Sequence, residues 1–285
     1  MSEKQKPTNW MCAALYGHFS LWAHSLRTIL MLIFALMMNY MLTRSEGARI
    51  MGMGYEVHMG EMVFSYLHQG FNMLMASFAF FVMMSEIPKH VPYQKYSTFR
   101  MTRRRWLASL VVFCMLIVLL YLALMTISSA LFSLPYASSG SGWSDLERLA
   151  ADPDYIYEIS YIPGYVVSSL SPLTASVMAG TILFLFWTAM AFIILLSSLY
   201  RAPNVGIVIC VATITGSIVI LVESIPGLKL LDSFSTMARI ASKFYEHELL
   251  AVGLAIVGWL LLNGLLVVLM DRRVQRMEIE FSGKE

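Results

Sequence analysis

The feature that most constrains this chain is a series of six long uncharged stretches, each bounded by charged residues. Sixteen uncharged residues separate Arg27 from Arg44, and 24 separate Glu61 from Glu86. The other four stretches are residues 106–144, 159–200, 202–222 and 249–270. A helix of about 20 apolar residues crosses the hydrocarbon core of a bilayer, and buried helices of soluble proteins rarely reach that length. The pattern predicts an all-α polytopic membrane protein.

We expect a single transmembrane domain over residues 1–285 with six transmembrane helices, at about 28–42, 62–84, 106–132, 174–200, 205–222 and 249–270. The connecting outer segments are then 44–60, 134–172 and 223–248. Only 13% of the residues are charged, against about 25% in a typical soluble domain. In the second outer segment, Ser144 and Glu147 have the spacing of a capping box, which predicts a short helix through about Ala151.

The charges are sorted between the two sides of this arrangement. The amino-terminal segment, the connection before the third span, Arg201 and the carboxy-terminal tail together carry 14 of the 20 Lys and Arg residues but 6 of the 18 acids. Cytoplasmic loops of membrane proteins are enriched in Lys and Arg. We therefore expect both termini to be cytoplasmic and the chain to lie in the cell (plasma) membrane.

Residues 8–26 are uncharged but rich in polar groups, which suits an amphipathic helix at the inner membrane surface better than a span. The alternative is a seventh span, which would give an odd number of crossings. The apolar positions recur every three or four residues, as on one face of a helix, and are Met11, Leu15, Phe19, Trp22 and Leu26.

The outer segment 223–248 also has a helical apolar repeat and is more than a solvated loop. Its regularly spaced apolar residues include Leu228, Leu231, Phe234 and Met237. This pattern predicts an amphipathic helix, which could be re-entrant or could rest on the outer leaflet.

Enzyme signatures are missing from the sequence. It contains no Gly-x-x-x-x-Gly-Lys-Ser/Thr loop for nucleotide phosphates, no His-Glu-x-x-His and no Gly-x-Ser-x-Gly. The spans hold no evident pair of carboxylates for a proton relay, and the three cysteines imply no disulfide framework. We expect neither catalysis nor a cofactor in this chain, and no nucleic-acid partner.

The layout resembles the membrane subunit of an ABC transporter of the type-2 export family. The likeness lies in a cytoplasmic amphipathic helix followed by six spans, a basic inner loop before the third span and an amphipathic insertion after the fifth. That family often carries a Pro-Ser/Thr-Arg-like stretch just before the third span. In this chain residues 101–106, Met-Thr-Arg-Arg-Arg-Trp, occupy that place without a proline.

The resemblance implies a permease subunit that forms the translocation path and binds a separate ABC ATPase subunit, which would hold ATP and Mg. A second permease copy or a homologue would complete the transporter. The coupling contact would lie within 93–105, and the insertion after the fifth span would act as an outer gate at Leu228, Leu231, Phe234 and Met237. The implied coupling residues are Glu86, Tyr96, Phe99, Arg103, Arg104 and Arg105.

The three consecutive arginines have a second interpretation. Arg103, Arg104 and Arg105 could anchor the topology beside anionic lipid, and one cluster can serve both purposes.

Polar side chains inside the spans are the other candidate functional residues. Uncompensated polar groups are costly in hydrocarbon, so they should face the helix bundle. Hydrogen bonding between helices is one interpretation, and lining of a substrate path is the other. The candidates are His68, Gln69, Asn72 and Asn263, and the same two interpretations apply to Asn39.

A copper site is a further hypothesis for the first outer segment. Thioether and imidazole ligands suit Cu(I), and Met51, Met53, His58 and Met59 lie close together in the sequence. The alternative is ordinary packing, because Met is a flexible apolar side chain and the chain has 22 of them.

A function of a different class also fits the sequence. The chain could be an accessory or immunity membrane protein that binds a peptide without transporting it. Docking of an ATPase on residues 93–105 would separate the two functions. Peptide, lipid and drug exporters can share one layout, so the sequence leaves the substrate open.

Overall fold

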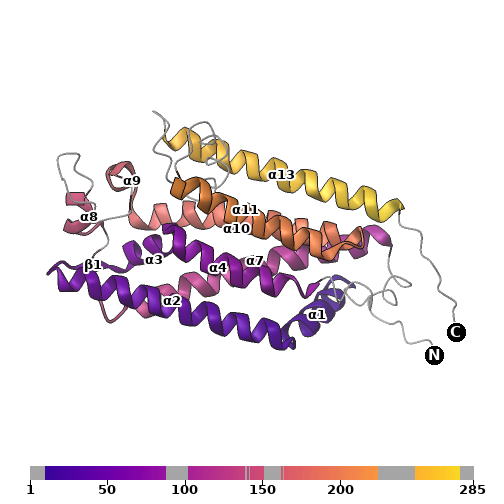
Figure 1. Ribbon diagram of the computed structural model, residues 1–285, viewed down its shortest axis with the longest axis horizontal. Helices are drawn as coiled ribbons and strands as arrows, with labels where there is room; N and C mark the ends of the chain where they lie inside the picture. Colours follow the sequence, from indigo (N-terminus) through magenta and orange to yellow (C-terminus); the bar gives the residue numbers. More distant parts are fainter. Residues whose placement is uncertain are drawn as a thin grey trace, which may run out of the picture.

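The computed structural model describes residues 10–87, 102–138, 140, 142–150, 162, 164–223 and 248–276. This part of the chain is all-α apart from two strands of two residues each, which confirms the all-α part of the prediction. Figure 1 shows long helices lying side by side in one elongated bundle.

Ten helices and two short strands make up the described part of the chain. In sequence order they are α1 (Trp10–Ala23), α2 (Leu26–Gly52), β1 (Val57–His58), α3 (Met59–His68), α4 (Gly70–Met84), α7 (Arg103–Ser133), β2 (Ala137–Ser138), α8 (Asp145–Ala150), α9 (Gly164–Ser169), α10 (Pro172–Leu199), α11 (Pro203–Glu223) and α13 (Glu248–Arg276). The two strands are parallel, with Val57 opposite Ala137.

The two ends of the bundle differ in what they contain. One end carries β1, α8 and α9, and we call it the strand end (Figure 1). The opposite end carries α1, the start of α7 and the end of α13, and we call it the basic end. Both limits of the described chain, Trp10 and Arg276, therefore lie at the basic end, which is what an even number of crossings requires.

Four helices are long and apolar enough to cross a membrane, namely α2, α7, α10 and α13. The bent pair α3 and α4 gives a fifth candidate if it counts as one span. In α11, which lies against α10, the segment whose side chains are described is Pro203–Gly216, and it is shorter than the roughly 20 residues that cross a bilayer. The structure thus supports four or five spans, and the sixth stays a prediction.

The observed helices extend beyond several predicted spans. The first was expected to end near residue 42, yet α2 continues to Gly52 because Thr43, Gly47 and Ile50 remain buried against neighbouring parts of the chain. The third begins at Arg103, where Thr102 accepts a hydrogen bond from the Arg105 amide as its N-cap.

The centre of the bundle is α10, which contacts α3, α7, α11 and α13. Its Trp187 stacks on Phe80 of α4 at 5.5 Å between ring centroids and donates from Nε1 to Ser77 Oγ at 2.9 Å. Tyr121 of α7 lies 5.2 Å from the Trp187 ring and donates its hydroxyl to the Ala76 carbonyl. These aromatic side chains fill the core and have their polar groups satisfied.

The amino-terminal helix packs against α7. Phe19 meets Phe113 edge to face at 5.0 Å, and the buried His18 Nε2 lies 3.2 Å from Ser109 Oγ. Leu15 and Trp22 also pack on the core cluster. The predicted apolar stripe therefore contacts the protein, and its last member, Leu26, is the exposed first residue of α2.

Candidate functional site

The sequence predicted one continuous helix over 62–84, but the structure has two helices here, α3 and α4, joined at a sharp bend. The axes of α3 and α4 differ in direction by 66°. At the junction Gln69 has an extended backbone (φ −67°, ψ 126°). It is both the C-cap of α3 and the N-cap of α4. Gly70, which follows, is a poor helix former. Non-helical backbone at membrane depth is tolerated only where protein or a water-filled cavity surrounds it.

Two predicted path residues lie next to this break and are buried. His68 is 1% exposed and Asn72 is 4% exposed. The His68 ring stacks on Phe64 at 5.1 Å, while Asn72 Oδ1 has no hydrogen-bond partner among the described residues. Gln69, at the break itself, is half-buried. The structure thus brings three of the four candidates together at one point of the second span.

The fourth candidate, Asn263, joins two helices instead. Its Nδ2 donates to the Leu185 carbonyl of α10 at 3.0 Å and to the Trp259 carbonyl of its own helix at 2.9 Å. Asn39 of α2 likewise joins two helices, since it donates to the Met125 carbonyl and to Ser128 Oγ of α7. Both amides make the interhelical hydrogen bonds that the sequence offered as one of two interpretations.

At the strand end, a carboxylate that sequence reasoning passed over holds the second outer segment. Glu61, in the first turn of α3, is 2% exposed. It accepts hydrogen bonds from the Ser144 backbone amide and from Ser144 Oγ, each at 2.9 Å. Ser144 Oγ also accepts from the Glu147 amide at 3.4 Å, which confirms the predicted start of α8.

Two neighbouring residues complete this contact. Trp143 lies edge to face with Phe64 at 5.6 Å and donates from Nε1 to the Leu170 carbonyl at 2.6 Å. His58 Nδ1 lies 2.5 Å from the Gly142 carbonyl oxygen. We call the contact formed by His58, Glu61, Phe64, Trp143 and Ser144 the outer clasp. It ties α3 to a segment more than 80 positions later in the chain.

The residues of the copper hypothesis are only partly available to a metal. Met51, Met53 and Met59 are exposed, but His58 uses Nδ1 toward Gly142, and its ring lies against Gly140. The described residues contain no group of three or more His, Cys, Asp or Glu that could hold a metal ion. A copper ion bound to His58 would have to compete with the outer clasp.

The basic end carries the described part of the predicted coupling region. Arg27 of α2 pairs with Glu86 at 3.0 Å. Arg103 donates to the Gln275 carbonyl at 2.9 Å, and Arg104 lies 3.7 Å from Asp271. The first turn of α7 and the last turns of α13 are thus joined at this end.

Several predicted residues lie outside the described residues. They are Tyr96 and Phe99 of the coupling region and Leu228, Leu231, Phe234 and Met237 of the outer gate.

No protein-family model, no curated protein and no solved structure matches this chain. The geometry alone therefore carries the assignment. It shows a helical protein with four candidate membrane spans, or five if the helix pair α3 and α4, bent at buried polar residues, counts as one span.

Proposed function

We propose that this chain is the membrane-spanning permease subunit of an ATP-driven ABC exporter. In this proposal it forms part of a translocation path, pairs with a second permease copy or a homologue, and binds a separate ATPase subunit that supplies ATP hydrolysis. The resemblance in layout is the starting point, and the arrangement of the basic end is the observation that carries the proposal furthest.

That arrangement suits a docking surface for a cytoplasmic partner. The helix α4 ends at Met84 and α7 begins at Arg103, both at the end where α1 and the last turn of α13 lie. The side chains of Arg103, Arg104 and Arg105 are exposed there. The contact between Arg104, 76% exposed, and Asp271 is a solvated pair at 3.7 Å, and such pairs contribute little to stability. Arg104 can therefore exchange Asp271 for an acidic partner at small cost.

Two other contacts at this end would transmit a force from such a partner. Arg103, at the start of α7, donates to the Gln275 carbonyl of α13, while Glu86 ties the end of α4 to α2. Movement of the connection over 88–101 would therefore act on four helices at once. In the proposed mechanism, closure of the ATPase subunits tilts these helices and alternates access to the path.

The broken second span is the part of the chain that we assign to the path. Interrupted helices with buried polar residues form substrate and ion sites in several transporter folds. His68 and Asn72 occupy such an interruption in this chain. The substrate class stays open.

A detergent pull-down of the tagged chain from its native host tests the proposal. We expect a stoichiometric P-loop subunit and vanadate-sensitive ATP hydrolysis. Arg103→Glu combined with Arg104→Glu should release that subunit, whereas the control Arg148→Glu, in α8 at the opposite end, should leave it bound. A chain that carries no ATPase, in a complex shown to survive the detergent, would overturn the proposal and favour a peptide-binding accessory protein.

A further inference from the structure

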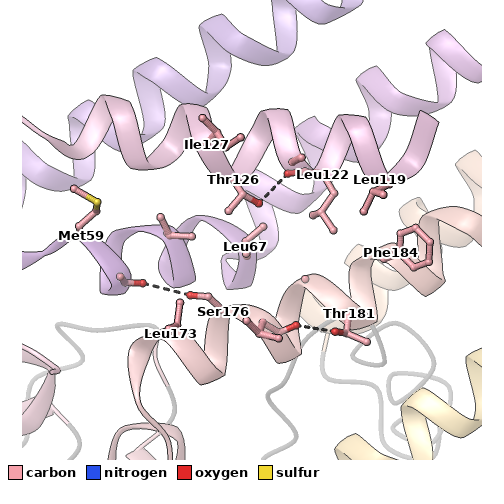
Figure 2. A pocket seen from close by; sticks show the side chains of 15 residues that line it. Met59, Leu67, Leu119, Leu122, Thr126, Ile127, Leu173, Ser176, Thr181 and Phe184 are labelled. Atoms are coloured by element: carbon pink, nitrogen blue, oxygen red, sulfur yellow. Dashed lines mark hydrogen bonds between the residues drawn. The ribbon is translucent and has the colours of Figure 1, made fainter. Parts of the chain in front are cut away.

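A groove of about 680 Å³ runs along the strand-end half of the bundle between α3, α7 and α10 (Figure 2). Each helix gives it one face, with residues three or four positions apart. Leu67 and Val63 come from α3, Leu122 and Thr126 from α7, and Gly180 from α10. The volume lies within the range of about 300–1,000 Å³ typical of ligand sites.

Two features of the lining helices leave this space open. The face of α3 that carries Glu61, Phe64 and His68 is held by the outer clasp and the core. Its other face, with Gly60 and Val63, is left toward α7 and α10. Small residues opposite, Ala123 and Gly180, keep the space open.

The lining is chemically uniform. It contains no charged residue. Its three hydroxyls are all bonded to backbone carbonyls of their own helices, Thr126 to Leu122, Ser176 to Pro172 and Thr181 to Val177, each at 2.8 Å. No lining group needs a polar partner. A peptide strand in this groove would leave its own amides and carbonyls unpaired, which is costly in hydrocarbon.

The length of the groove matches one leaflet. Its lining on α10 runs from Leu173 to Phe184, about 16 Å at the helical rise of 1.5 Å per residue. Half of the hydrocarbon core of a bilayer is about 15 Å thick. The groove starts in the first turn of α10, so if that turn lies at the membrane boundary, the groove would extend through about one leaflet from the strand end.

We propose that this groove binds one acyl chain of a bilayer lipid from the leaflet at the strand end. Three helices enclose the chain, so it exchanges more slowly than lipid on the open helix faces. The exposed side chains Ile127, Leu173 and Val177 form the rim through which it enters from the bilayer. This inference concerns binding alone and stands whether or not the chain is a permease.

The test uses the full-length protein in phosphatidylcholine vesicles that contain a phosphatidylcholine with a diazirine in one acyl chain. After illumination, peptide mapping locates the lipid adducts. Adducts should concentrate on the groove residues of α7 and α10, above the level on Leu261 and Leu265, which lie on the open face of α13. Equal labelling of both faces, or no label in the groove, would overturn the proposal.

A matched pair of variants tests whether the groove itself is responsible. A side chain added at Gly180 would point at Leu122, 3.9 Å from the new Cβ, whereas nothing lies within 4 Å of a Cβ at Gly264 on α13. Gly180→Leu should lower groove labelling about tenfold, because overpacking a fitted site disrupts it, and Gly264→Leu should not change it. Unchanged labelling with Gly180→Leu would contradict the proposal.

A cysteine at Val177 then examines the other possible occupant. If two copies covered each other's grooves, Val177→Cys would form a crosslink between copies in the membrane. Such a crosslink would overturn the lipid proposal and identify a second copy as the occupant of the groove.

Discussion

Glu61 and Ser144 lie 83 positions apart in the sequence and are joined by two hydrogen bonds of 2.9 Å, one to the backbone amide and one to the hydroxyl of Ser144. Both side chains are almost fully buried. This single pair fixes where α8 begins and which face of α3 turns toward the second outer segment. It is the central contact of the outer clasp.

Removal of the Ser144 hydroxyl should loosen the strand end. Ser144→Ala leaves one carboxylate oxygen of Glu61 short of its donor in a buried site, which costs about 1–3 kcal/mol of unfolding free energy. Thr181→Ala is the matched control, because that hydroxyl is exposed and bonds to the Val177 carbonyl of its own helix.

The buried thiols of Cys114 and Cys210 allow the measurement. In a Cys12→Ser background, a maleimide that fluoresces on reaction reports thermal exposure of these two thiols. A melting curve for Ser144→Ala that overlays that of Thr181→Ala would show that the hydroxyl bond to Glu61 contributes nothing.

The amide of Asn39 should stabilise the contact between α2 and α7. It donates to Ser128 Oγ at 2.7 Å and accepts from Thr43 within its own helix. Hydrogen bonds between membrane helices contribute about 0.6–2 kcal/mol, so Asn39→Leu should lower stability by that amount. A double-mutant cycle with Ser128→Ala isolates the pair. A coupling energy of zero would mean that the bond to Ser128 contributes nothing and that any loss comes from the bond to the Met125 carbonyl.

Two glycines of α11 should respond to alanine in opposite ways. A Cβ at Gly206 would meet the Ser197 side chain and lie 2.9 Å from the Ile194 Cα, both on α10, whereas a Cβ at Gly216 meets nothing within 4 Å. We expect Gly206→Ala to destabilise the protein by about 1–3 kcal/mol through overpacking. Gly216→Ala should stabilise it by about 0.4–1 kcal/mol by restricting the unfolded chain.

The same thiol assay measures both variants. Equal effects of the two substitutions would show that α10 and α11 do not approach as closely as the structure has them.

The two ends of the bundle should lie on opposite sides of the membrane. Gly52 is exposed at the strand end and Arg276 at the basic end. In a background without native cysteines, Gly52→Cys should react with an impermeant maleimide in intact cells, and Arg276→Cys should react only after permeabilisation. Reaction of both from outside would refute the cytoplasmic position expected for the carboxy terminus.

The sequence predicted the long helices because hydropathy and helix length follow from local composition. Arg103–Ser133 and Pro172–Leu199 lie within a few residues of their predicted spans. The capping box at Ser144 was likewise recognisable from spacing alone.

Contacts between distant segments were not predictable in the same way. The residues on both sides of Gln69 are uncharged, so hydropathy gave no sign of a break there. Gly70 and the neighbouring polar residues were the sequence features that could have indicated one. The role of Glu61 depends on Ser144, and nothing in the periodicity of either segment indicates that pairing. Burial of His68 and Asn72 followed from the cost of polar groups in hydrocarbon, but their place at a break did not.

The contact between Arg103 and the Gln275 carbonyl has a consequence for biosynthesis. These residues are 172 positions apart, so the first turn of α7 is synthesised long before its partner exists. Until Gln275 is synthesised, Arg103 lacks this partner, and the arginine cluster can contact lipid headgroups or the insertion machinery at the membrane surface. This end can close only after α13 has left the ribosome, so the synthesis of α13 is the step that completes the contact.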